Sequence, residues 1–145
     1  MDGAFHRLAS TLGFALALAV GAGESLGSQS PGLDDFLGTW RGSSRCTDLV
    51  AAPACRDEVV VYTVRPSDSA GRAKGAADKI VDKQRVPMGE FEFAYDKGEA
   101  CWRAEFETPR FHGVWCLVVE GKQMMGTLRL LPAGATIRKL QLRHE

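Results

Sequence analysis

The chain has 145 residues, 45% of them hydrophobic and 25% charged, and its 18 basic residues balance 18 acidic ones. This length accommodates one ordinary domain. A formal net charge of zero excludes the basic surplus of a general nucleic-acid binder. The composition also excludes a disordered acidic tail or a polycation.

The beginning of the chain has the pattern of an export signal. Arg7 ends a short polar start, and an uncharged run with the apolar centre Leu12–Val20 follows. That centre is shorter than the about 20 residues of a membrane-spanning helix, and small residues come after it as signal peptidase requires. We therefore expect a periplasmic or secreted protein with no membrane span after cleavage. The expected divisions are a signal peptide over 1–23, a flexible N-terminus over 24–33 and a single domain over 34–145.

Beyond residue 35, apolar residues alternate in short runs separated by turn residues, which is typical of β-strands. Most connections are short, so neighbouring strands should pair as antiparallel hairpins. The expected strands are Phe36–Arg45, Glu58–Arg65, Lys74–Val81, Arg85–Tyr95, Ala100–Thr108, Phe111–Glu120, Gln123–Leu131 and Ala135–Arg143.

Consecutive hairpins predict one continuous apolar face. A two-residue turn at Gly121-Lys122 sets Trp115 opposite Leu128. The same face continues if Trp102 lies opposite Trp115, and Phe93 opposite Trp102. The face then comprises Phe91, Phe93, Tyr95, Trp102, Phe106, Phe111, Trp115, Leu117, Val119, Met124 and Leu128.

The four cysteines, Cys46, Cys55, Cys101 and Cys116, all follow the leader. An even number in an exported chain favours disulfides over metal ligands or redox chemistry. We expect one disulfide between the first two, which closes the loop TDLVAAPA. The predicted register sets the other two directly opposite each other on the polar face, within disulfide reach.

One apolar and one polar face in a meander of about eight strands predict an all-β fold, an antiparallel up-and-down β-barrel. Closure removes the exposed strand edges, and a two-sheet sandwich is the alternative. An eight-stranded barrel is either packed by side chains or holds one small ligand. The bulk of the inward aromatic side chains favours a filled core over a cavity.

The segment Leu37-Gly38-Thr39-Trp40 resembles the Gly-x-Trp opening of the lipocalins and their calycin relatives. The resemblance implies structural roles for Gly38 and Trp40, with Trp40 at the closed barrel end beneath Arg143 or, as an alternative, Arg138. It also implies an aromatic-lined ligand site, made here of Phe91, Phe93, Tyr95, Trp102, Phe106, Phe111 and Trp115. Small periplasmic protease inhibitors are similar as well, with a comparable barrel, a Trp in the first strand and a nearby disulfide.

The polar face carries one candidate constellation. The register sets Glu92 opposite Arg103, and it sets Glu90, Glu105 and His112 in one row across three strands. Two carboxylates and an imidazole can bind a metal or share a proton. Alternating charges are also what a solvated barrel exterior shows, and we expect that simpler interpretation and no metal.

The connector Thr108–Gly113 combines a proline, a cation and an aromatic ring. A binding loop at a barrel mouth has this character, but a hairpin turn started by Pro109 is the more economical interpretation.

No Gly-x-Ser-x-Gly elbow or phosphate-binding loop occurs, so we expect neither an enzyme nor a cofactor. The expected function is that of a lipocalin-like protein that binds a small apolar ligand at the barrel mouth. The alternative is a protein-binding module, such as an inhibitor of a periplasmic enzyme, built on a filled barrel. It would use the N-terminal segment, the loop Cys46–Cys55 and the connector Pro109–His112. A cavity of about 300 Å³ or more separates the two.

Overall fold

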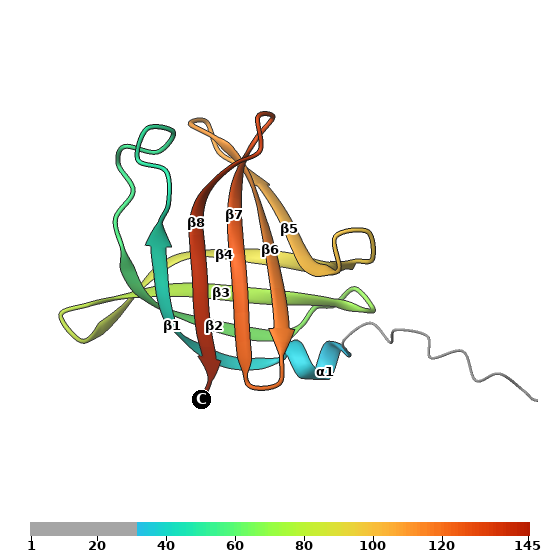
Figure 1. Cartoon of the computed structure of the whole chain (residues 1–145). Coiled ribbons are helices and arrows are strands. Elements are labelled where there is room, and N and C mark those ends of the chain that lie inside the picture. The colour runs from blue at the N-terminus through green and yellow to red at the C-terminus, as the bar shows by residue number, and fades with distance from the viewer. Residues whose placement is uncertain (1–31) are drawn as a thin grey trace, which may run out of the picture.

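The computed structural model describes residues 32–145, so the expected leader and most of the N-terminal segment lie outside the described residues. Its elements are α1 (Leu33–Phe36), β1 (Gly38–Cys46), β2 (Glu58–Pro66), β3 (Arg72–Val81), β4 (Gln84–Asp96), β5 (Cys101–Glu107), β6 (His112–Glu120), β7 (Gln123–Leu131) and β8 (Ala135–His144). The strands form a closed barrel in sequence order, with β1 paired to β8 (Figure 1). The predicted all-β, up-and-down barrel of eight strands is confirmed. Among the described residues, no helix has the length and apolar character needed to cross a membrane.

The two ends of the barrel differ. In Figure 1, α1, the β6–β7 turn and the C-terminus lie at the bottom, whereas the β1–β2, β5–β6 and β7–β8 loops lie at the top. Phe36 closes the bottom, because its ring stacks on Trp102 at a centroid distance of 4.7 Å and meets Phe93 edge-on at 5.4 Å. The prediction of Phe36 in a strand is therefore wrong. The indole N–H of Trp40 donates a hydrogen bond to the Phe36 carbonyl oxygen at 3.0 Å, which holds the helical turn against the barrel end.

The Gly-x-Trp segment lies at this closed end. Trp40 is fully buried, and its ring meets that of His144 edge-on at 4.8 Å. Gly38 has φ +118°, and a side chain there would overlap the imidazole of His144. Arg143 is exposed and lies opposite Arg41 of β1. Alternate residues of a strand point to opposite sides, so the Arg143 side chain is on the outer face of the barrel, away from Trp40. The expectation that Arg143 covers Trp40 is wrong, and His144 takes that place.

One predicted register is correct and two are shifted. Trp115 lies opposite Leu128 as expected. Trp102, however, lies opposite Leu117 and Tyr95 rather than opposite Trp115 and Phe93. A shift of two residues preserves the side on which each strand residue lies, so the predicted apolar face still points inward except at Phe111, which lies outside the strands.

The shifts originate in the turns. Asp96 ends β4 because its Oδ1 accepts hydrogen bonds from the backbone N–H groups of Gly98 at 2.8 Å and Glu99 at 3.0 Å. Thr108 stabilises the next turn, since its Oγ1 accepts from the Phe111 N–H at 3.1 Å. Side-chain caps of this kind place each turn one residue later than the alternation suggests.

Both predicted disulfides are present, with Cα–Cα distances of 6.0 Å for Cys46–Cys55 and 5.5 Å for Cys101–Cys116. Cys101 is not directly opposite Cys116, because Arg103 occupies that position. The second disulfide instead joins diagonal neighbours of β5 and β6 on the outer face.

Candidate functional site

An open hollow of about 470 Å³ occupies the barrel toward its mouth. Four of the predicted ligand-site residues line it, namely Phe91, Phe106, Phe111 and Trp115. The other three lie in the packed closed half, where Phe93 and Trp102 contact Phe36, and Tyr95 contacts Trp102. The barrel is thus filled at one end and hollow at the other.

The aromatic side chains of the hollow hold one another in place. Phe91 meets Phe106 edge-on at 5.2 Å and Trp115 at 6.4 Å. Tyr62 also meets Trp115 edge-on, at 6.3 Å. Edge-to-face packing of this kind contributes beyond simple burial and gives the wall a fixed shape.

Two polar groups in this aromatic wall are hydrogen-bond donors. Burial raises the pKa of the Tyr62 phenol well above its ordinary value, an effect only partly offset by the nearby guanidinium of Arg138. The phenol therefore keeps its proton. The indole nitrogen of Trp115 is buried without a hydrogen-bond partner among the described residues.

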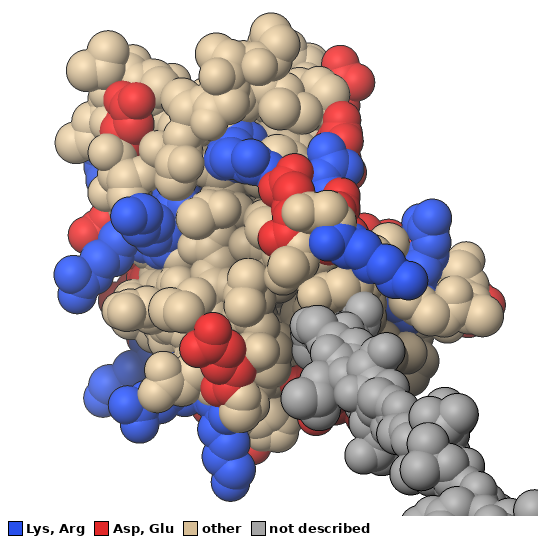
Figure 2. Space-filling model, turned by 45° about the vertical axis from the view of Figure 1, so that its right-hand side comes forward, with Lys and Arg blue, Asp and Glu red and all other residues tan. Residues whose placement is uncertain are grey.

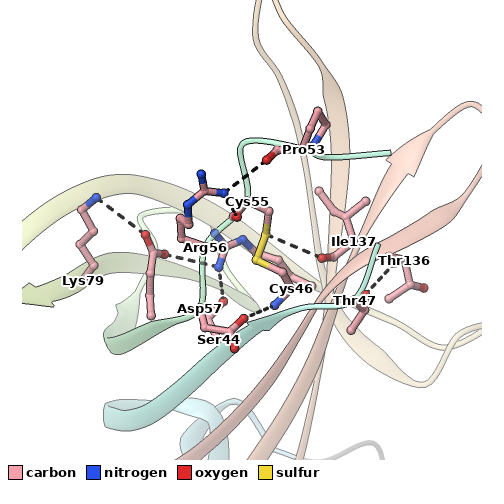
Figure 3. The surroundings of a disulfide bond; sticks show 12 residues. Ser44, Cys46, Thr47, Pro53, Cys55, Arg56, Asp57, Lys79, Thr136 and Ile137 are labelled. Atoms are coloured by element: carbon pink, nitrogen blue, oxygen red, sulfur yellow. Dashed lines mark hydrogen bonds and ion pairs between the residues drawn. A yellow bond between two sulfur atoms is a disulfide. The ribbon is translucent and has the colours of Figure 1, made fainter. Parts of the chain in front are cut away.

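A charged cluster forms the polar part of the wall. Arg138 donates a hydrogen bond to the Ser44 hydroxyl oxygen at 2.8 Å and forms an ion pair with Glu58 at 3.4 Å. Glu58 also pairs with Lys79 at 3.7 Å, so two cations share one carboxylate (Figure 3). Arg138 is the one cation in the described wall of the hollow, which is mainly apolar but also includes Glu90 and Glu107.

The β1–β2 loop stands at the rim. The disulfide Cys46–Cys55 closes it, and the Thr47 hydroxyl donates a hydrogen bond to the Thr136 carbonyl oxygen at 2.7 Å (Figure 3). Residues 51–55 also line an adjoining hollow of about 430 Å³, which shares Phe111 and Arg138 with the first. The loop is therefore a fixed part of the mouth.

The connector between β5 and β6 is the expected hairpin turn. The Thr108 N–H donates to the Phe111 carbonyl oxygen at 2.9 Å. Phe111 does not join the buried face as predicted: its residue is 42% exposed, and its ring meets Phe106 edge-on at 5.6 Å. The ring lies at the rim of the hollow.

The predicted polar row is only partly assembled. Glu105 contacts His112 at 2.6 Å and Arg103 at 2.7 Å on the outer face. The hydrogen bond from Arg103, and then that from His112, lowers the pKa of Glu105. Glu90 pairs with Arg65 at 3.0 Å instead of joining this group.

The shifted register also separates the predicted Glu92–Arg103 pair. Ala94 lies opposite Arg103, and Glu92 pairs with Arg72 at 3.5 Å. Within residues 32–145, one group with metal-ligand proximity occurs, Glu99 with Cys101 and Cys116. Its two sulfur atoms are bonded to each other, so the group offers no thiolate ligand.

Sequence reasoning missed Tyr62, Ser44 and Glu58 as wall residues. Residues 59–61 are three consecutive valines, so β2 shows no alternation there that would indicate which of its side chains point inward. Pairing with β1 would have resolved it, because Tyr62 lies opposite the buried Trp40.

Comparison of the chain with models of protein families, with curated proteins and with solved structures found no match.

Proposed function

We propose that this protein is an exported, non-enzymatic binding protein of lipocalin-like shape that takes a small, mainly apolar ligand at the barrel mouth. The hollow of about 470 Å³ carries the proposal. Its volume lies within the range of about 300–1,000 Å³ that is typical of small-molecule sites. Export is supported by two disulfides, which persist in oxidising compartments such as the periplasm or the extracellular space.

The wall also favours a ligand with an oxygen acceptor. The Tyr62 phenol stays protonated and lines the hollow, so it can donate a hydrogen bond to such an acceptor. Arg138 is the one cation that lines the hollow in the described part of the chain, and its guanidinium can pair with an acceptor that is an anion. An aliphatic or cyclic carboxylate satisfies both the apolar and the polar part of the wall.

Narrowing the hollow is expected to weaken binding. Ala77 on β3 is buried and lines the hollow, so Ala77→Leu projects three additional carbon atoms into it. Ala76 is its neighbour on the outer side of the same strand, and Ala76→Leu is the matched control. Binding of 1-anilinonaphthalene-8-sulfonate, followed by fluorescence, is expected to weaken about tenfold in Ala77→Leu, equivalent to about 1.4 kcal/mol, and to stay unchanged in the control.

Competition identifies the preferred headgroup. Decanoate is expected to displace the dye at lower concentration than 1-decanol, and Arg138→Met is expected to remove that difference. Equal dye binding by both leucine variants would instead show that the dye binds outside the barrel, and the proposed function would fail.

A second function is favoured by the shape of the β1–β2 loop. Asp48 Oδ1 accepts hydrogen bonds from the backbone N–H groups of Val50 at 3.0 Å and Ala51 at 2.8 Å. These hydrogen bonds fix the turn of the loop, and at this turn Leu49 and Val50 are exposed to solvent, at 58% and 95%. A rigid loop with apolar side chains at its tip is suited to insertion into a partner protein, as in an enzyme inhibitor.

This second function predicts inhibition that depends on the tip. Purified protein would be added to a panel of secreted serine and cysteine proteases with chromogenic substrates. Val50→Asp is expected to abolish any inhibition while leaving dye binding intact, because Val50 does not line the hollow. Wild-type protein that inhibits no protease of the panel would remove protease inhibition from consideration.

A further inference from the structure

The outer face of the seam between β1 and β8 carries two pairs of like charges. Arg41 lies directly opposite Arg143, and Arg45 lies directly opposite Lys139. All four residues are exposed. Like charges directly opposite one another destabilise a sheet, so the fold tolerates an unfavourable arrangement here.

These cations are poorly neutralised by the protein itself. Within residues 32–145, Arg45, Lys139 and Arg143 have no carboxylate oxygen within ion-pair distance. Arg41 reaches Glu145 at 4.0 Å, but that carboxylate is shared with Arg85. Elsewhere on the outer face, by contrast, several cations form ion pairs with carboxylates, for example Arg65 with Glu90, Arg72 with Glu92 and Arg103 with Glu105. In a chain of zero net charge, the seam is a local excess of positive charge.

An uncharged row separates the two cationic pairs. Strand pairing places its members side by side across five strands: Val59, Ser43, Gln141, Met125 and Val118. Two hollows of about 790 and 480 Å³ lie along the seam and share Ser43, Met125 and Gln141. We call this surface the basic trough. In Figure 2, where the front strands of Figure 1 have turned to the left, Lys and Arg side chains project along that edge.

We propose that the basic trough binds an extended acidic segment of a partner protein. Arg41 and Arg45 are four residues apart on β1, so the two cationic pairs are separated by about 13 Å. Side chains of an extended segment point alternately to its two sides. Carboxylates of a segment that lies along the uncharged row would therefore reach both pairs.

The chemistry of the floor fits a polypeptide. The Ser43 hydroxyl and the Gln141 amide can hydrogen-bond to a peptide backbone, and the exposed Met125 can adapt to varied side chains. In the described part of the chain, no aromatic side chain lines either hollow, so the stacking platforms of nucleic-acid sites are absent. Glu120, at the edge of the larger hollow, is the one carboxylate in the described walls. It favours a segment whose acidic residues lie toward the two cationic pairs.

A fluorescein-labelled octaglutamate peptide is the probe, with octaglutamine as its neutral counterpart. Fluorescence anisotropy is expected to show binding of octaglutamate alone, weakening as salt is added. Lys139→Glu is expected to weaken binding by at least about tenfold. Lys97→Glu makes the same change of net charge in the exposed β4–β5 turn, and it is expected to bind like the wild type.

A thermal melt separates loss of a binding group from loss of structure. In Lys139→Glu the new carboxylate faces Arg45, so the like-charge repulsion becomes an attraction and the melting temperature is expected to rise. Failure of octaglutamate to bind, or equal weakening by Lys97→Glu, would overturn the proposal. Binding to vesicles of phosphatidylglycerol that depends on Lys139, without binding to octaglutamate, would also overturn it in favour of a lipid surface.

Discussion

Trp102→Ala is expected to lower the free energy of unfolding by about 3–5 kcal/mol, the range for removal of a buried aromatic side chain. Trp102 is 2% exposed at the packed end of the barrel. Its ring stacks on Phe36 at 4.7 Å and meets Tyr95 edge-on at 5.5 Å. Alanine would leave a void and remove the surface against which α1 closes the barrel. Urea unfolding followed by circular dichroism measures the change.

Trp102→Phe is the matched control. The indole nitrogen of Trp102 has no hydrogen-bond partner among the described residues, so phenylalanine loses packing volume but no hydrogen bond. We expect the Phe variant to lose less than about 1.5 kcal/mol, as conservative core replacements do. A loss below about 1 kcal/mol in Trp102→Ala would place the ring at the surface and contradict the strand register.

The fold was predictable because its dominant signal is a period of two. The bounds of β7, Gln123–Leu131, agree with the alternation residue for residue. The registers of β4–β5 and β5–β6 were not predictable to the same degree. A slip of two residues keeps every side chain on its own side, so alternation cannot distinguish the two registers. The caps formed by Asp96 and Thr108 decide between them.

The candidate site was predictable only in part, because packed and hollow barrels share one apolar pattern. This barrel is packed at one end because the Phe36 side chain of α1 fills the closed end, whereas the mouth stays open. Arg138 was considered only for the closed end, yet it lines the mouth. The pairing of β7 with β8 is irregular at one point. Leu128 lies opposite Arg138, whereas the next residue, Arg129, lies opposite Thr136. The alternation of apolar and polar residues does not predict this irregularity.

The double substitution Cys101→Ala with Cys116→Ala is expected to lower the free energy of unfolding by about 3 kcal/mol, the chain-entropy value for a loop of this length. The two cysteines are 15 residues apart and join neighbouring strands of the closed barrel. Urea unfolding of the variant, compared with the wild type before and after reduction, measures the effect. Reduction that leaves the wild type as stable as before would contradict the disulfide in the folded protein.

The pair Cys46→Ala with Cys55→Ala is the informative comparison. Its separation of 9 residues gives a similar loss, about 2.6 kcal/mol by the same chain-entropy estimate. The location differs, however, because residues 51–55 line the hollow at the rim whereas Cys101 and Cys116 lie outside the barrel. We therefore expect weaker dye binding only when the first disulfide is lost, although both variants lose stability. Equal dye binding by the two variants would show that the loop takes no part in the ligand site.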